Sequence, residues 1–507
     1  MVEHRQLVFR LRIMFCKLLV LSLGAIAGIA LAIDRPNVLL LTVDDMSCDS
    51  VGVYGCPVPD TSPRMDALAA ESMRFEHAHV QVGNCYPSRN VMWSGLYPHN
   101  NGVEGFYEID NTGKYKVVAD FFQDAGYFTA IRGKVTHTTP YNPYPGWDLT
   151  HQYPQPKPSV LKDVKSYGDS MRKAIEAAEA AEKPFLANLN VSDPHKPFYT
   201  GPKDPHQPSR VFTADEMVIP GFLLDDPAIR TELALYYSSV RRADDAVGAI
   251  LDALKEGGHW DNTIIVFLSD HGMPLPFAKT SVFHHSSRTP LMIRWPGKTK
   301  AGAVDDAHMV SAVDFTPTLL EMCGIETDAN FDGRSFAPLL IGETQADRDF
   351  VFKVYNENSG AQRWPMRGLQ TKQHLYIFNA AATGENRFKT ATQGTATYKK
   401  IVELAETDAI AAKRLKDHDY RTYEEFYDIS KDPNCLVNLA TDPEQAPAMK
   451  QLHRRLDEIM ERTGDHCLAP FRSRSDPDTL RTYIEEKEGE SAARRAGKRK
   501  KKKNKNR

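Results

Sequence analysis

The chain of 507 residues is long enough for more than one domain, and its 41% hydrophobic and 25% charged residues exclude a disordered or fibrous protein. A formal net charge of −3 gives the body of the chain no electrostatic reason to bind nucleic acid. Seven cysteines are too few for a disulfide scaffold. In an oxidising compartment two pairs are candidates for bridges, Cys48 with Cys56 and Cys435 with Cys467.

The N-terminus has the pattern of a secretory signal. Basic residues precede an apolar run at 18–31, and small residues follow at Ala30 and Ala32. We therefore predict a signal peptide at 1–32, cleaved after Ala32, and export to the periplasm, the exterior or a lysosome-like compartment. An uncleaved anchor is the alternative, although the run is short for a membrane span.

Short apolar runs rich in β-formers predict buried strands, and segments with helical apolar spacing separate them. This alternation indicates an α/β sandwich around a large, mainly parallel sheet. The predicted strands are 37–43, 128–131, 184–191, 263–268 and 291–295, and the predicted helices begin at Ser62 or lie at 165–181, 228–256 and 314–322. The proline-rich segment 140–158 is predicted to be a surface loop.

The pattern changes at about residue 347 to shorter strands at 375–379 and 426–429, followed by a helix at 446–463. We predict a catalytic domain at 33–346 and a smaller α+β domain at 347–471. Residues 472–507 form a polar and basic tail, and 494–507 should be disordered because they are almost wholly basic and lack large apolar residues.

The segment Asn84–His99 contains a cysteine at the start of a predicted helix. Pro87 suits the first turn of a helix, where no backbone N–H is needed, so Cys85 lies near the N-terminus. The helix dipole and Arg89 favour an anion there, which makes Cys85 a candidate nucleophile. The alternative is a buried cysteine in an ordinary helix.

Polar side chains follow the predicted strands at the point where each strand ends. In an open α/β sheet, ligands bind outside the carboxyl ends of the strands. Three carboxylates and an imidazole would form a cation site with Cys85, beside two lysines and two histidines, and oxygen ligands suit Ca²⁺ or Mg²⁺. The predicted metal ligands are Asp44, Asp45, Cys85, Asp270 and His271; the predicted catalytic residues are Cys85, Arg89, Lys134, His137, His195 and Lys279.

Taken together, these motifs resemble the type I, formylglycine-dependent sulfatases over about residues 35–470. Cys85-x-Pro87-Ser88-Arg89 is similar to the family signature, and the family's other motifs follow in its order: Asp44-Asp45, Gly133-Lys134, Pro194-His195-x-Pro197-Phe198 and Ser269-Asp270-His271-Gly272. The resemblance implies an alkaline-phosphatase-like fold with a mixed sheet, one bound Ca²⁺, and conversion of Cys85 to formylglycine by a maturation enzyme.

The resemblance also implies a role for each residue. The hydrated aldehyde at position 85 attacks sulfur while Ca²⁺, Arg89, Lys134 and Lys279 neutralise the sulfuryl oxygens. His195, with Lys279, protonates the leaving group, and His137 removes a proton from the second hydroxyl so that sulfate is expelled. Unmodified cysteine lacks this chemistry, so the immature protein should be nearly inactive.

Further motifs are similar to the heparan N-sulfatase branch, among them Gly272-Met273-Pro274, Trp364-Pro365-Met366-Arg367 and Asn438-Leu439-Ala440. Two features instead resemble iduronate-2-sulfatases: the spacing Lys134-x-x-His137 and histidine at position 271. The predicted substrate is a sulfated glycan with N-sulfated glucosamine as the lead. A sugar O-sulfatase, a phosphatase or phosphonate hydrolase, and a non-catalytic glycan-binding relative are the alternatives.

The basic tail predicts electrostatic retention on a sulfated polysaccharide or an anionic envelope, and the alternative is a solvated end without a partner. No specific nucleic-acid partner is predicted. The sequence gives no indication of the oligomeric state.

Overall fold

A computed structural model describes residues 35–109, 115–141, 144–151 and 158–505. Residues 37–507 form one compact unit. The predicted signal peptide at 1–32 lies outside the described residues and remains a prediction. Within the described ranges, no helix combines the length and the apolar character that crossing a membrane would require.

An eight-stranded sheet forms the centre of this unit, in the order β5-β4-β6-β1-β7-β8-β2-β9. The strands that carry the predicted site pair in parallel, whereas β8 runs antiparallel to both β7 and β2. The strands are β1 (Asn37–Asp44), β2 (Met73–Phe75), β4 (Phe128–Arg132), β5 (Leu149–His151), β6 (Phe185–Pro194), β7 (Thr263–Ser269), β8 (Leu291–Arg294) and β9 (Val304–Asp305). The predicted mixed, mainly parallel sheet is confirmed.

The central strand β1 is buried along its whole length, as its continuous apolar run requires. Alternate residues point to opposite faces, so Leu39 and Leu41 join one hydrophobic core while Val38 and Leu40 join the other. Val43 pairs with Val191 of β6 on one side and with Ser269 of β7 on the other. The three strands therefore end together, and the polar residues after them lie at one edge of the sheet.

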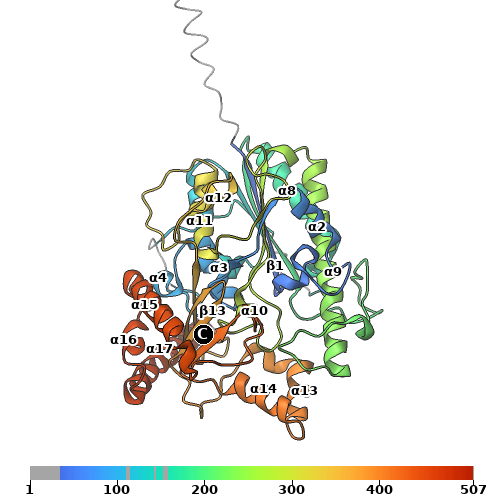
Figure 1. Ribbon diagram of the computed structural model, residues 1–507. Coiled ribbons are helices and arrows are strands. Elements are labelled where there is room, and N and C mark those ends of the chain that lie inside the picture. Colours follow the sequence, from blue (N-terminus) through green and yellow to red (C-terminus); the bar gives the residue numbers. More distant parts are fainter. Residues whose placement is uncertain (1–34, 110–114, 142–143, 152–157, 506–507) are drawn as a thin grey trace, which may run out of the picture. The chain divides into compact units, whose positions relative to one another are not determined.

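Helices cover both faces of the sheet (Figure 1). On one face, α8 (Val164–Ala180) and α9 (Pro227–Glu256) pack their apolar stripes against Leu39 and Leu41. On the other face lie α5 (Val118–Asp124) and α11 (Phe315–Met322). Other helices are α2 (Pro63–Ala70), α3 (Cys85–Ser94), α4 (Pro98–Asn101), α6 (Val135–Thr138), α7 (Pro158–Leu161), α10 (His284–Ser287) and α12 (Ala337–Leu340).

The C-terminal part contains a second, antiparallel sheet in the order β11-β12-β13-β14. Its elements are β11 (Phe350–Glu357), β12 (Arg363–Thr371), β13 (His374–Asn379) and β14 (Glu424–Asp428), with α13 (Ala396–Leu404), α14 (Ala409–Asp419), α15 (Ala446–Thr463), α16 (Leu468–Arg472) and α17 (Pro477–Lys505). One hydrophobic core runs from the large sheet to this one, for example from Leu41 to Leu369. Hydrophobic packing therefore continues across the predicted boundary at 346/347. The division into two domains there remains a prediction.

Three sequence-based expectations differ from the structure. Residues 149–151, within the predicted loop 140–158, form the edge strand β5, because Leu149 pairs with Ala130 of β4; residues 142–143 and 152–157 lie outside the description. A three-residue edge strand depends on its neighbour, so its own sequence carries little signal.

The second difference concerns the cysteines. None of the six cysteines among the described residues forms a disulfide. Cys48 is packed in the hydrophobic core, Cys467 lies beside Arg367 and Tyr483, and the thiol of Cys435 donates to the carbonyl of Pro433 at 3.9 Å.

The third difference concerns the tail, because the long helix α17 (Pro477–Lys505) includes residues 494–505 of the segment 494–507 that was predicted to be disordered. Leu480 and Tyr483, one helical turn apart, are buried in the hydrophobic core and fix the first half of this helix. The last two residues, 506–507, lie outside the described residues.

Candidate active site

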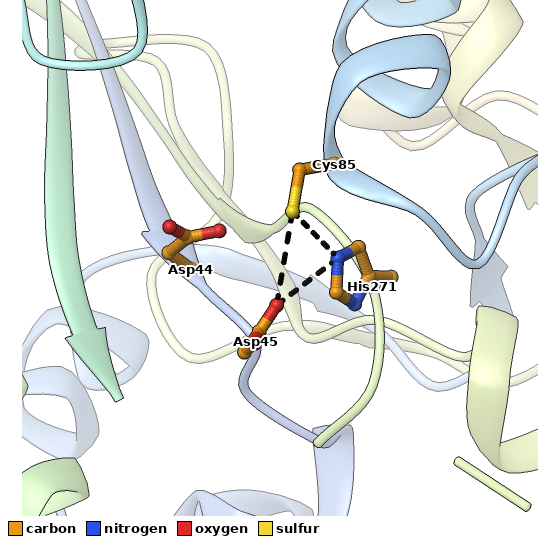
Figure 2. Close-up of side chains that lie close together, drawn as sticks. All are labelled: Asp44, Asp45, Cys85 and His271. Atoms are coloured by element: carbon orange, nitrogen blue, oxygen red, sulfur yellow. Dashed lines mark hydrogen bonds and ion pairs between the residues drawn. The ribbon is translucent and has the colours of Figure 1, made fainter. Parts of the chain in front are cut away.

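Cys85 begins α3 and is 2% exposed, at the edge where β1 and β7 end (Figure 2). Burial raises the pKa of its thiol although Lys279 and Lys134 pull it down. The helix N-terminus and the lysines therefore do not produce a reactive thiolate, because loss of solvation outweighs them. As a cysteine, residue 85 is a neutral thiol.

Acidic groups from two strand ends surround this thiol. The Sγ atom of Cys85 lies 3.9 Å from Oδ1 of Asp45 and 3.3 Å from Nε2 of His271, and these two atoms are 3.1 Å apart. One possible ligand atom from each of these residues and from Asp44 lies within 4.8 Å of the others, and all four residues are buried. Asp270 accepts a hydrogen bond from the backbone N–H of Asp45, which holds the two strand ends together.

Three basic side chains balance the carboxylates. Lys134 Nζ lies 2.5 Å from Oδ2 of Asp44, and Lys279 Nζ lies 2.7 Å from both carboxylate oxygens of Asp45. Arg89 donates from Nε to Asp270 at 3.0 Å, and its Nη2 lies 3.6 Å from Asp44. The predicted residues of both signs are thus brought together at one point.

The three carboxyl groups of the cluster differ in the direction in which their pKa values are shifted. Burial would raise the pKa of Asp44, but Lys134, His195 and Arg89 lower it well below the usual range. Burial is likewise outweighed at Asp45, where Lys279 is the main cause of a pKa of about 2. At Asp270 burial prevails over the lowering effect of His271 and Arg89, so the pKa is raised, and Asp44 and Asp45 add to the rise.

The histidines occupy different positions around the cluster. His271 points into it, and burial lowers its pKa, so the ring is neutral. His137 packs against the rings of Tyr86 and Phe106, with centroids 4.9 and 6.0 Å away, and burial lowers its pKa well below the usual value. His195 follows β6, and its Nδ1–H donates to the carbonyl of Lys196 at 2.6 Å. It lies close enough to lower the pKa of both Asp44 and Asp45, so it belongs to the same site.

Two buried polar atoms in the cluster have no hydrogen-bond partner, Oδ1 of Asp44 and Nη2 of Arg89, and they form only an ion pair with each other at 3.6 Å. A buried charged atom without a hydrogen bond is costly, and such atoms mark places where a ligand completes the site. A carboxylate oxygen of this kind fits a divalent cation, and a guanidinium nitrogen of this kind fits an anion. The residues present therefore suit a hard cation bound next to an oxyanion.

Residues that the sequence analysis did not identify hold the predicted ones in place. Oδ1 of Asn190 accepts from Nη1 of Arg89 at 2.5 Å, and its Nδ2 donates to the carbonyls of Arg132 and Gly133 at 3.0 Å. Asn190 thus connects the guanidinium to the turn that carries Lys134. The available signal was an asparagine near the end of a mainly apolar strand, although the same strand also contains Asn188.

The turn itself has an unusual backbone conformation. Gly133 and Lys134 both have positive φ, 67° and 51°. A Cβ atom at position 133 would lie 2.9 Å from the carbonyl oxygen of Asn190, so only glycine fits. This close approach of β4 to β6 directs Lys134 towards Asp44.

The region that contains this cluster matches a known protein family. A family model described as "Sulfatase" matches residues 36–325, which include every predicted site residue. The chain belongs to the sulfatase family. It is therefore an enzyme that hydrolyses a sulfate ester or a sulfamate. A second model, "N-sulphoglucosamine sulphohydrolase, C-terminal", matches residues 270–418.

Individual relatives of this sulfatase agree with the family assignment. Human N-sulphoglucosamine sulphohydrolase is 28% identical over 468 residues, covering 85% of this chain and 91% of the relative. An ulvan-active sulfatase from Formosa agariphila is 27% identical, with 85% and 81% covered. The crystal structure of a phosphonate monoester hydrolase from Agrobacterium radiobacter has a TM-score of 0.64 at 19% identity, with 85% and 96% covered. The last similarity concerns the fold alone.

Proposed function

We propose that this sulfatase removes sulfate from a sulfated glycan, with N-sulfated glucosamine as its preferred unit, using formylglycine at position 85 and one Ca²⁺ ion. The observation that carries the proposal is the position of Cys85, whose Sγ lies within 4.0 Å of Asp45, His271 and Lys279. The N-sulphoglucosamine sulphohydrolase model over 270–418 supports the choice of substrate. We also propose export through 1–32 and maturation by a formylglycine-generating enzyme.

Asp44, Asp45 and His271 would hold the cation together with Asp270, whose Oδ1 lies 3.8 Å from Nε2 of His271. The oxygen-rich set favours Ca²⁺ or Mg²⁺, and the bound ion supplies positive charge that polarises the sulfate oxygens. Formylglycine at position 85 supplies a hydrated aldehyde in place of a thiol. The raised pKa of the Cys85 thiol agrees with a precursor role, because a protonated thiol is a poor nucleophile.

The chain's own cations bind the sulfate group. Arg89, Lys134 and Lys279 converge on the carboxylates beside residue 85, so their N–H groups are already oriented before substrate arrives. Such preorganised charge stabilises the transition state without reorganisation during the reaction. Asn190 fixes the Arg89 guanidinium, and Asp45 fixes the Lys279 ammonium.

Two histidines would carry out the proton transfers. His195 faces the cluster and donates a proton to the departing nitrogen or oxygen of the sugar. His137 has a lowered pKa, so its ring is neutral and accepts a proton from the group at position 85. Its Nδ1 is buried without a hydrogen-bond partner.

A sugar O-sulfatase is the second candidate. It is favoured by His271, which lies 3.3 Å from the reactive position, and by the ulvan-active relative, a sulfatase of a different glycan. A sulfamate and a sulfate ester differ in the leaving atom, so the two candidates differ in substrate but not in the sulfate-binding residues.

The deciding experiment is hydrolysis of N-, 2-O- and 6-O-sulfated sugars by enzyme produced with a formylglycine-generating enzyme. We expect sulfate release from the N-sulfated sugar at the highest kcat/KM. Preference for an O-sulfated sugar would establish the second candidate, and faster hydrolysis of aryl phosphate or phosphonate than of aryl sulfate would refute both. Mass spectrometry of the Cys85 peptide provides the control: unmodified cysteine in active enzyme would exclude the formylglycine mechanism.

A further inference from the structure

The helix α17 divides into two parts of opposite charge. Its first half, through Glu490, contains five acidic and two basic residues, whereas 494–505 contains nine lysines and arginines and no acidic residue. At 1.5 Å per residue, these twelve positions span about 18 Å, or about one positive charge every 2 Å. Cations at the C-terminal end of a helix are also favoured by its dipole.

The first half of α17 is fixed to the C-terminal sheet. Glu488 accepts a hydrogen bond from the backbone N–H of Arg363 at 2.8 Å, and Ser491 donates to Glu357 at 2.5 Å. Arg494 forms an ion pair with Glu357. After this point the side chains of residues 495–497 are exposed, so the basic half begins where the packing ends.

This transition lies beside a loop that reaches the active site. The guanidinium of Arg494 lies 3.8 Å from the centre of the Tyr107 ring. The residue before Tyr107 is Phe106, whose ring packs against Tyr86 and His137 at centroid distances of 6.2 and 6.0 Å. A chain of direct contacts therefore joins the start of the basic half to the catalytic histidine His137.

We propose that residues 494–505 (the basic half-helix) bind a sulfated polysaccharide and hold it next to the active site. The charge density matches a linear polyanion, and the anchor at Arg494 fixes one end of the helix near residue 106. The identity of the polyanion rests on the proposed function, whereas binding itself needs no catalysis.

Two other polyanions fit the composition less well. The basic half-helix has no apolar residue larger than Ala496, so it lacks the apolar face with which helices insert into a lipid surface. It has no aromatic residue on which nucleic-acid bases could stack, and the whole chain carries a net charge of −3. A sulfated polymer requires only closely spaced positive charge.

Tethering changes the kinetics in a specific way. A polymer held by the basic half-helix presents its sulfated units to the site at a raised local concentration, so KM for the polymer falls while kcat is unchanged. A small sulfated sugar is too short to occupy both places and gains nothing. The effect should disappear at high salt, because exposed charges are screened within about 3 Å at 1 M.

The test replaces seven residues of the basic half-helix with glutamine, leaving the anchor Arg494 intact. The variant contains K498Q, R499Q, K500Q, K501Q, K502Q, K503Q and K505Q. A matched control removes the same number of charges from exposed lysines elsewhere, as K173Q, K183Q, K203Q, K298Q, K300Q, K416Q and K450Q. Binding of heparin is measured by calorimetry at 50 mM NaCl in a Cys85→Ala background.

We expect the first variant to bind heparin at least tenfold more weakly and the control to bind within twofold of the parent. In matured enzyme, KM for polymer should rise several-fold while kcat/KM for a sulfated monosaccharide stays unchanged. Equal binding by the parent and the first variant, or equal losses in both variants, would overturn the proposal. Loss of binding to anionic phospholipid vesicles alone would assign the helix to membranes instead. Inactivity on every sulfated sugar with intact heparin binding would refute only the proposed function.

Discussion

Asn190 shows how a neutral residue organises a site made of charges. It is 2% exposed, and each polar atom of its side chain has a partner. One partner is the Arg89 guanidinium and the other two are carbonyls of the Lys134 turn. Two of the three basic side chains of the cluster are thus positioned through one amide, at the end of β6.

Replacing Asn190 with alanine should reduce activity more than it reduces folding stability. Arg89 would lose an acceptor at 2.5 Å and the Lys134 turn its donor, so kcat should fall about 10- to 100-fold, equal to about 1.4–2.7 kcal/mol. KM should change less, because the loss concerns charges aligned with the transition state. Steady-state kinetics on the best substrate of the panel measures this.

The strand supplies a matched control. Asn188, two residues earlier, is equally buried, and its side-chain atoms have no hydrogen-bond partner. Asn188→Ala should therefore lower stability through packing and leave kcat near the parent value. Similar kcat losses in the two variants would show that β6 packing, not the Asn190 amide, determines the activity.

At the scale of elements, the carboxylate of Asp244 joins α9 to α2. It accepts from the backbone N–H groups of Arg64 at 3.0 Å and Met65 at 2.8 Å, in the first turn of α2. Burial raises its pKa to about 7, and the two hydrogen bonds offset only part of that rise. A helix cap that ionises near neutrality makes the packing of two helices depend on pH.

This raised pKa determines the direction of the pH effect. Between pH about 4 and 7 the folded protein keeps a proton that the unfolded chain releases, so the free energy of unfolding falls as pH rises through this window. The contribution should be about 1–3 kcal/mol, and it should be complete above pH 7. Asp244→Asn should remove this slope, which urea unfolding at pH 5 and pH 8 measures.

The neighbouring substitution Asp245→Asn is the control, because Asp245 binds Ser209 on the outer side of α9 instead of α2. Its variant should keep the slope of the parent. An identical pH dependence in the parent and in Asp244→Asn would mean that another group titrates in this window.

Several long elements of the large sheet and its covering helices could be predicted from the sequence, whereas β11, β12, α13 and α14 were not predicted, and neither were the shortest strands. Apolar residues recur at strand or helix spacing within β1, β6, β7, α8 and α9. The positions of these elements were therefore predicted to within a few residues. In contrast, β3 (Ala78–His79), β5 and β9 have two or three residues each, and their pairing depends on remote partners. The same distinction holds in the site: charged strand ends were identified, whereas Asn190 acts through contacts across 101 residues of sequence.

At the scale of the whole molecule, the candidate active site is a buried cluster of positively and negatively charged side chains. Asp44, Asp45 and Asp270 face Arg89, Lys134 and Lys279, and all six side chains are buried or nearly so. Burying charges costs free energy unless each is well paired, and Oδ1 of Asp44 has only an ion pair with Nη2 of Arg89 at 3.6 Å and no hydrogen bond. Burial also raises the pKa of Asp270, and the neighbouring Asp44 and Asp45 add to that rise. A bound cation would relieve both.

Calcium should therefore stabilise the folded protein as well as support activity. At a concentration 100 times Kd, binding to the folded state alone adds about 2.7 kcal/mol to the free energy of unfolding, so Tm should rise by several degrees. Chelation with EGTA should reverse the rise in the Cys85→Ala variant too, because this variant keeps all three carboxylates.

Asp270→Asn should abolish the response of Tm to Ca²⁺. Asp244→Asn, a substitution of a buried aspartate outside the cluster, should retain it. Differential scanning calorimetry with Ca²⁺, Mg²⁺ and EGTA separates these cases: a Tm unaffected by Ca²⁺ in the parent, or a full response in Asp270→Asn, would show that these carboxylates do not hold the ion.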